Sequence, residues 1–179
     1  LISGNGMFSG WGLSWGGWLD NRRGEWFLLA QLLLITAHLL PPWPAPADWG
    51  VGMWPRPVFI VGVLLLLSGF GVAAQAFTAL GSSLSPLPEA KQGNRLILQG
   101  PYQRCRHPMY QAVLLCSLGV ALSIGSLLHL ILLMGLVAVL GGKARREERS
   151  LLQLHPDYAA YRSTTPAIAP GLPWLDWRN

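Results

Sequence analysis

A short polar motif, residues 100–110, precedes a long and nearly uncharged stretch of the chain. Pro108 suits the first turn of a helix, where its missing N–H is no loss, so we expect His107 at the helix cap. The free N–H groups of such a helix end attract anions, and Tyr102 and Tyr110 offer flat rings on which a nucleobase could stack. The motif therefore predicts a binding site, although a snorkelling arginine and a capping histidine at a membrane border would produce the same pattern.

The adjacent carboxylates Glu147 and Glu148 lie in a charged segment that follows the apolar stretch. Residues four apart share a helix face, so Lys143 and Glu147 could face one pocket while Arg146 and Arg149 point elsewhere. A solvated helix face with weak salt bridges would explain the same residues. We interpret the polar motif and the carboxylate pair as two halves of one pocket at a membrane surface.

The composition indicates an integral membrane protein. Of the 179 residues, 51% are hydrophobic and 12% are charged, whereas a soluble domain carries roughly 25% charged residues. The net charge of +5 could attract nucleic acid. However, the cations flank apolar segments and form no stripe with interleaved aromatics, which is the pattern of membrane orientation. We therefore expect membrane lipids as partners and no nucleic acid.

No metal site or disulfide is expected. Cys105 lies in the polar motif and Cys116 in an apolar run, and neither has a zinc-ligand spacing. His38 and His129 lie near the ends of apolar segments without carboxylates at their level, so we expect each to lie at the membrane interface or to form hydrogen bonds within a helix bundle. The first 20 residues lack a charged start followed by an apolar core, so no signal peptide is expected.

The hydropathy pattern predicts an all-α integral membrane fold with four to five membrane helices. Residues 25–40 form a first apolar run, which is short for a span of about 20 residues, and residues 58–80 form a second that is long enough. Residues 109–122 and 126–140 are expected to form a tight hairpin of short helices, and residues 143–155 to continue as a helix that leaves the membrane. Prolines in the tail after residue 156 should make it fold back.

We expect a single domain with two parts. Residues 1–57 would contain a Trp-rich interfacial segment and the first membrane helix, and residues 58–179 the catalytic region. All lysines and arginines except Arg56 lie on the side of the termini and of the linker 81–107 if the chain crosses four times. By the positive-inside rule this side is cytoplasmic, so the linker and the C-terminal helix can meet there. They would form a pocket without Rossmann strands, because no phosphate-binding glycine motif follows a strand.

The order of these motifs resembles one enzyme superfamily. G-x-Y-x-x-x-R-H-P-x-Y, a short apolar hairpin, E-E-x-x-L and Y-x-x-Y follow one another. This order is similar to that of the isoprenylcysteine carboxyl methyltransferase and phospholipid methyltransferase superfamily of integral membrane enzymes. The similarity covers about residues 60–175, and it includes the elements Leu84-Ser85-Pro86-Leu87-Pro88 and Gly171-Leu172-Pro173-Trp174.

The resemblance implies that S-adenosylmethionine is the methyl donor. It implies a donor site formed by Asn94, Arg95, Leu96, Ile97, Tyr102, His107, Pro108, Met109, Tyr110 and Glu147. It also places Lys143 at the methyl acceptor, where prenylcysteine enzymes carry an arginine. Lysine cannot grip a carboxylate with a planar fork, so the acceptor stays open. We assign Lys143, Arg106 and Glu148 to the catalytic group, with Glu148 available to assist an amine acceptor.

The predicted function is S-adenosylmethionine-dependent methyl transfer at the cytoplasmic membrane face. The acceptor would be a lipophilic or small molecule that carries a carboxylate, a thiol or an amine. Two alternatives stay open. One is a membrane reductase of the sterol-reductase type, and the other is a non-catalytic protein that binds lipids or assists assembly.

Overall fold

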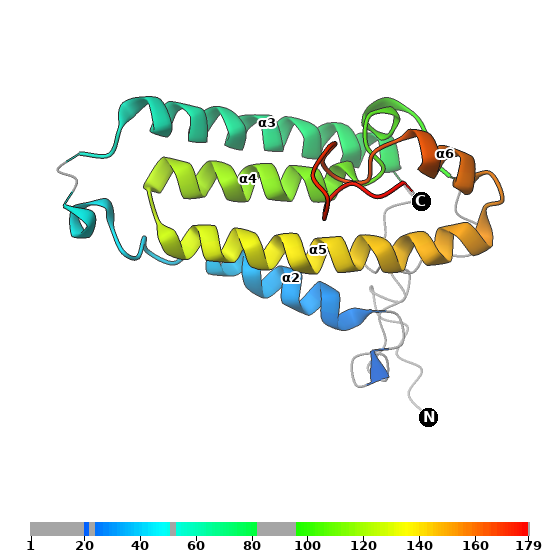
Figure 1. Cartoon of the computed structure of the whole chain (residues 1–179), viewed down its shortest axis with the longest axis horizontal. Helices are drawn as coiled ribbons and strands as arrows, with labels where there is room; N and C mark the ends of the chain where they lie inside the picture. The colour runs from blue at the N-terminus through cyan, green and yellow to red at the C-terminus, as the bar shows by residue number, and fades with distance from the viewer. Residues whose placement is uncertain (1–19, 22–23, 51–52, 82–95, 179) are drawn as a thin grey trace.

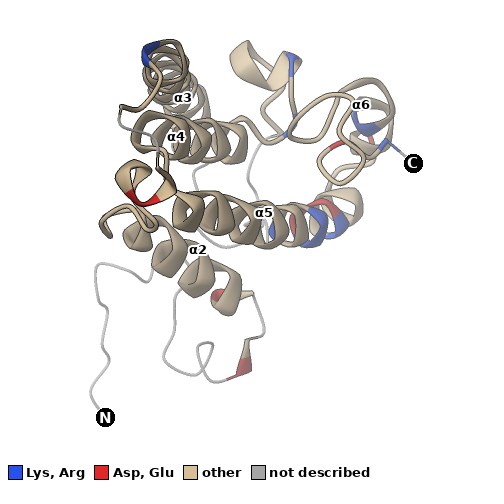
Figure 2. Cartoon of the chain, turned by 60° about the vertical axis from the view of Figure 1, so that its left-hand side comes forward, with Lys and Arg blue, Asp and Glu red and all other residues tan. Residues whose placement is uncertain are grey.

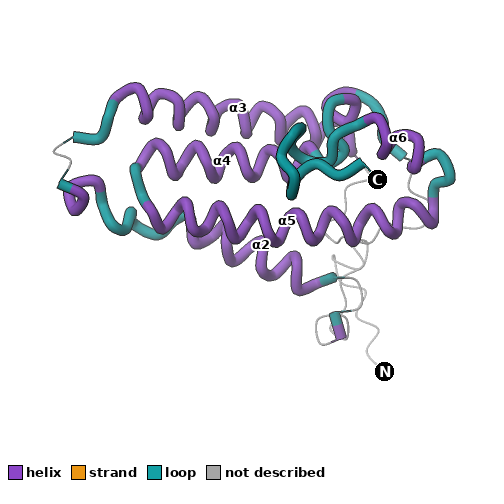
Figure 3. The backbone as a smooth tube through the Cα atoms, viewed as in Figure 1, coloured by secondary structure: helices purple, strands orange, loops and turns teal. Residues whose placement is uncertain are grey.

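The computed structural model describes residues 20–21, 24–50, 53–81 and 96–178, and within them all regular structure is helical (Figure 3). The prediction of an all-α fold is confirmed for these residues. The α-helices are α2 (Glu25–Ala37), α3 (Arg56–Leu80), α4 (Pro108–Ile124), α5 (Leu127–Leu154) and α6 (Tyr158–Thr164). Two 3-10 turns accompany them, η2 (Pro46–Trp49) and η4 (Gly100–Gln103).

Four helices lie side by side in the order α3, α4, α5, α2 (Figure 1). α4 and α5 form the predicted hairpin, and α2 packs on the far side of α5. α3 and α5 are long and apolar enough to cross a membrane, and α2 and α4 are shorter apolar helices. Four to five membrane helices therefore stay a prediction.

Glycines bring α3 and α4 into close backbone contact. A Cβ atom on Gly62 would lie 2.7 Å from the carbonyl oxygen of Gly119, and one on Gly119 would lie 2.6 Å from the backbone nitrogen of Leu66. One on Gly69 would lie 2.9 Å from the carbonyl oxygen of Ala112. Small residues at such crossings are typical of helices that pack in membranes.

The α4–α5 turn is held by residues that are distant in sequence. Gly125 ends α4 in the left-handed conformation, with φ at +63°, and the Trp54 ring packs where a side chain at residue 125 would lie. Trp54 Nε1 donates to the carbonyl of Leu122 at 2.7 Å. The buried hydroxyl of Ser126 accepts from the Trp43 backbone nitrogen at 3.1 Å.

His38 and His129 are hydrogen-bonded within the bundle, as predicted. His38 Nε2 lies 2.6 Å from Ser117 Oγ, and its Nδ1 donates to the Leu34 carbonyl at 2.7 Å. His129 is fully buried, with Nδ1 2.8 Å from Ser126 Oγ and Nε2 3.2 Å from the His38 carbonyl. These contacts tie α2 to α4 and α5 near the turn.

The predicted hairpin segment 126–140 and the helix predicted to continue from it over residues 143–155 form one helix, α5. α5 is a continuous helix of 28 residues, whereas α4 has 17. Gly141 and Gly142 do not interrupt α5, because their missing side chains leave room for Trp174 and Phe27. The helix therefore continues from the apolar hairpin into the charged segment without a break.

Many of the charged residues lie at one end of the bundle, in α6 and the second half of α5 (Figure 2). The middle of α3 is apolar and largely exposed, with Phe59, Leu64, Leu67 and Phe70 each about half exposed or more. An apolar surface of this extent is unusual on a soluble monomer. It suits contact with lipid tails.

Candidate functional site

The site begins where the polar motif enters α4. Pro108 is the first residue of α4 and His107 is its cap, as predicted. The backbone nitrogens of Arg106 and His107 do not point freely outward. They donate to the carbonyls of Pro166 and Ala167 in the C-terminal tail, each at 2.9 Å. The tail therefore folds back onto the motif, as its prolines predicted.

Side chains strengthen this contact between the motif and the tail. Cys105 Sγ lies 3.3 Å from the Ala167 carbonyl, and Gln111 Nε2 donates to the Ile168 carbonyl at 2.9 Å. Burial raises the pKa of the Cys105 thiol to about 11. A thiol that stays protonated is a poor nucleophile, so Cys105 acts here as a packing residue.

Glu148 is the centre of a buried ionic cluster. Its Oε1 lies 2.9 Å from both His107 Nε2 and Arg106 Nε. Its Oε2 accepts from Trp177 Nε1 at 2.7 Å and lies 3.6 Å from Arg162 Nε. One carboxylate thus joins the motif, α5, α6 and the tail.

The remaining guanidinium nitrogens of Arg106 are also engaged. They donate to the backbone carbonyls of Arg162 and Trp177, and Arg106 is 4% exposed. This geometry favours a positioning role for Arg106 and Glu148. We predicted a catalytic role for Arg106 and Glu148. That role stays a prediction, and the contacts of both side chains with protein groups do not favour it.

Glu147 points to a different set of partners. Tyr110 Oη donates to its Oε2 at 3.0 Å, and His107 Nδ1 lies 3.6 Å from the same oxygen. The rings of His107 and Tyr110 stack with centroids 5.3 Å apart. The Glu147 side chain is 30% exposed, and its Oε1 has no hydrogen-bond or ion-pair partner among the residues the structure describes.

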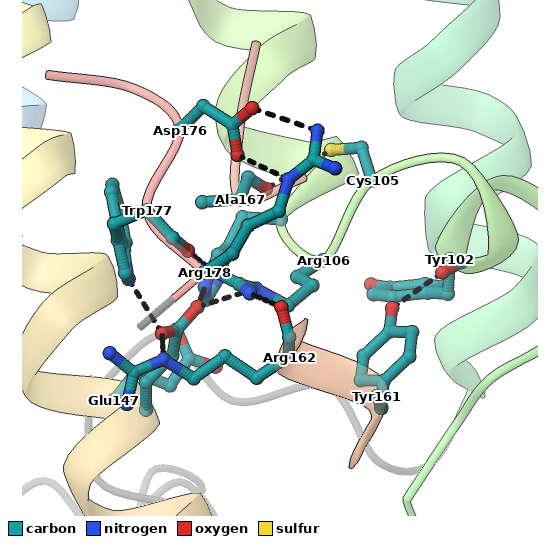
Figure 4. Close-up of polar contacts among 12 residues, drawn as sticks. Tyr102, Cys105, Arg106, Glu147, Tyr161, Arg162, Ala167, Asp176, Trp177 and Arg178 are labelled. Atoms are coloured by element: carbon teal, nitrogen blue, oxygen red, sulfur yellow. Dashed lines mark hydrogen bonds and ion pairs between the residues drawn. The ribbon is translucent and has the colours of Figure 1, made fainter. Parts of the chain in front are cut away.

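Tyr102 lies beside this carboxylate. Tyr102 is buried. Burial, and to a smaller extent the negative charge of Glu147, raises the pKa of the Tyr102 phenol well above its usual range. Its backbone carbonyl accepts from Tyr161 Oη on α6 (Figure 4), and the Tyr161 ring meets that of Tyr158 edge-on at 5.7 Å. The tyrosines of α6 therefore pack against the polar motif through the Tyr102 backbone.

Lys143 lies one helical turn before Glu147 and faces the same tyrosine. Its Nζ is 5.3 Å from the centroid of the Tyr110 ring and donates to Gln31 Oε1 at 2.8 Å. Arg149 is exposed and bonds within its own helix, and Arg146 donates to the Asn21 carbonyl on another side. The structure thus has Lys143 and Glu147 on one face, as helix spacing predicted.

The structure brings together Arg106, His107, Tyr110, Lys143, Glu147 and Glu148, with Tyr102 adjacent. Pro108 and Met109 form the first turn of α4, and Leu96 and Ile97 are half-buried in the preceding loop. Asn94 and Arg95 lie outside the described residues. A shallow hollow lined by Gln75, Thr78, Ala79, Gln99, Gly100 and Pro101 contains none of the predicted site residues.

Three functional contacts were missed at the sequence level: Trp177, Arg162 and Gln31. Gln31 had a usable signal, because an amide inside an apolar helix needs a partner. Trp177 and Arg162 lie in a polar tail where nothing in their spacing predicts that they meet Glu148.

Comparison with known proteins adds to this geometry. Residues 57–156 match the model of the phospholipid methyltransferase family. The cobalt-zinc-cadmium resistance protein CzcN of Cupriavidus metallidurans is 32% identical over 165 residues, which cover 86% of this chain and 68% of that protein. No solved structure matches the chain significantly. The resemblance predicted from the motifs is confirmed.

Proposed function

The chain belongs to the phospholipid methyltransferase family, which is part of the isoprenylcysteine carboxyl methyltransferase-like superfamily, and we propose that it transfers a methyl group from S-adenosylmethionine to a lipophilic or small acceptor. Membership supports a membrane methyltransferase in general. The donor, the acceptor class and the cytoplasmic location are our proposals.

The arrangement around Glu147 supports the donor proposal most directly. The carboxylate is partly exposed, has one oxygen without a partner among the described residues, and lies beside the stacked rings of His107 and Tyr110. Carboxylates and aromatic faces both attract cations. These residues fit S-adenosylmethionine, which when bound supplies an electrophilic methyl group on a positively charged sulfur. His107, Tyr110 and Glu147 would hold it, together with Tyr102.

The buried cluster around Glu148 would orient this site. With Glu148 ionised, its Oε1 accepts from His107 Nε2, which fixes the ring plane and directs Nδ1 toward Glu147. Arg106 compensates the buried charge. Fixed orientation matters because aligning two reactants can contribute roughly 7–11 kcal/mol to catalysis.

Lys143 would face the acceptor. Its ammonium attracts an anionic group such as a carboxylate or thiolate and repels a protonated amine, so we favour an anionic acceptor over an amine. The charged end of the bundle would lie at the cytoplasmic surface, with the donor entering from water and the acceptor from the bilayer.

The name of the similar CzcN protein refers to resistance to cobalt, zinc and cadmium. In the described part of this chain, no three side chains of His, Cys, Asp or Glu come together to hold a metal ion. The geometry therefore gives no support for proposing metal as the ligand of this site. Membership of a methyltransferase family favours methyl transfer over the reductase alternative. The other alternative, a non-catalytic protein that binds lipids or assists assembly, would not bind the donor.

Binding of S-adenosylhomocysteine to the purified chain in detergent tests the proposal. We expect calorimetry to show binding by the wild type. Glu147→Gln should weaken it about tenfold, because S-adenosylhomocysteine lacks the sulfonium charge but keeps an ammonium and hydroxyl groups that can donate to the carboxylate, and a charged hydrogen bond contributes roughly 1.5–3 kcal/mol. Arg149→Ala changes an exposed side chain of the same helix and should leave the affinity unchanged. Absence of binding at millimolar ligand would favour the non-catalytic alternative, and equal weakening by both variants would contradict the site.

A further inference from the structure

Gln31 connects α2 to the proposed acceptor cation. From Trp26 to Ala37, Gln31 and Thr36 are the polar residues of α2. An amide in an apolar membrane helix is costly without a partner, and Gln31 Oε1 accepts from Lys143 Nζ at 2.8 Å. The family match covers residues 57–156, so Lys143 lies inside it and Gln31 lies outside.

Among the groups around the Lys143 ammonium, Gln31 is the one that determines where the ammonium lies. Lys143 is 2% exposed. α4 contributes the face of Tyr110, 5.3 Å away, and α5 contributes Glu147 one turn later, whose Oε2 is occupied by Tyr110 Oη. α2 contributes the amide of Gln31, the hydrogen-bond acceptor that the described residues offer to this ammonium. A lysine has a flexible four-carbon stem, so the location of its acceptor decides where its charge rests.

We infer that Gln31 is a positioning residue that holds the Lys143 ammonium over Tyr110, toward the methyl acceptor. That the methyl acceptor lies on this side of Lys143 rests on the proposed function. The hydrogen bond between Gln31 and Lys143 does not depend on it. Two ammonium N–H groups and the amide N–H groups of Gln31 have no partner among the described residues. The pair therefore presents hydrogen-bond donors only, which suits an oxygen or sulfur anion.

Acylation of the lysines by acetic anhydride tests this role, because only the uncharged amine reacts. The chain has two lysines, so Lys91 is an internal reference when both rates are followed by peptide mass spectrometry. Gln31→Leu removes the acceptor that stabilises the ammonium. We expect Lys143 to react about fivefold faster relative to Lys91 at pH 6.5, where the ammonium still predominates.

Gln31→Glu should have the opposite effect. A carboxylate at this position stabilises the ammonium more than an amide does, so we expect Lys143 to react about fivefold more slowly. Thr36→Val changes the other polar residue of α2 and should leave the ratio of the two rates unchanged. Only a directed contact gives opposite signs for the two Gln31 variants, because a loosened fold would accelerate both.

Faster acylation in both Gln31 variants, or no change in either, would overturn the inference. Binding of S-adenosylhomocysteine is measured separately on the same proteins. Gln31→Leu should bind it as well as the wild type, and loss of binding would show that Gln31 supports the fold or the donor site instead. A wild type that binds no donor while the two acylation rates still shift in opposite directions would refute the proposed function but keep the contact.

Discussion

Glu148 and Glu147 are neighbours in sequence with different surroundings. The Glu148 side chain is 3% exposed and contacts four side chains, whereas that of Glu147 is 30% exposed. Removing one member of a buried ion pair leaves the other charge uncompensated, which typically costs 3–5 kcal/mol. We expect Glu148→Gln to lower the free energy of unfolding by about 3 kcal/mol, measured by titration with SDS in mixed micelles.

Glu147→Gln is the matched control for this prediction. Its carboxylate is partly solvated, and Tyr110 can still donate to an amide oxygen, so its effect on unfolding should stay below about 1 kcal/mol. Equal losses of stability in the two variants would contradict the division between a structural and a ligand-facing carboxylate.

The sequence predicted which face of α5 carries Lys143 and Glu147, but it did not predict the contacts of Glu148. The i, i+4 rule correctly placed Lys143 and Glu147 on one side of α5, because that relation is local. It could not show that Glu148 meets Arg106 and Trp177. Those contacts depend on how the tail folds back over residues 105–107, which is a tertiary property.

At the scale of helices, the α3–α4 crossing depends on Gly119. A Cβ atom there would approach the backbone nitrogen of Leu66 to 2.6 Å and the carbonyl oxygen of Gly62 to 2.7 Å. Backbone atoms cannot move aside as a flexible side chain can. We expect Gly119→Ala to destabilise the protein by about 1–3 kcal/mol, measured by the same SDS titration.

Gly71→Ala provides the control for this crossing. Gly71 lies in the same helix as Gly62, and a Cβ atom at residue 71 would meet nothing within 4 Å. The unfolding free energy of this variant should not fall, because alanine is a better helix former than glycine. A loss at Gly71 as large as that at Gly119 would show that the close crossing is not what makes the Gly119 substitution destabilising.

Helix boundaries were largely predictable from the sequence, whereas the neighbours of individual helix residues were not. The apolar runs predicted α2, α3 and α4 to within a few residues. The helix predicted to continue over residues 143–155 follows segment 126–140 without a break, as α5. Gly141 and Gly142 accept Trp174 and Phe27 as close neighbours, and only the tertiary structure shows this.

At the scale of the whole molecule, the distribution of charge separates the two ends of the bundle. The polar motif, the second half of α5, α6 and the tail carry twelve of the sixteen charged residues that the structure describes, whereas Arg56 begins α3 and Asp48 lies in η2. The positive-inside rule associates the cation-rich end with the cytoplasm. The proposed donor site lies at that end, where a water-soluble donor is available.

This orientation predicts the outcome of reporter fusions in a bacterial host. Green fluorescent protein fused after Asn179 should fluoresce, because it folds in the cytoplasm, and alkaline phosphatase at the same position should be inactive. Alkaline phosphatase fused after Gly125, at the α4–α5 turn, should be active because that turn would face the other side of the membrane. Phosphatase activity at Asn179 without activity at Gly125 would show the opposite orientation in the membrane. The proposed site could then not reach a donor in the cytoplasm.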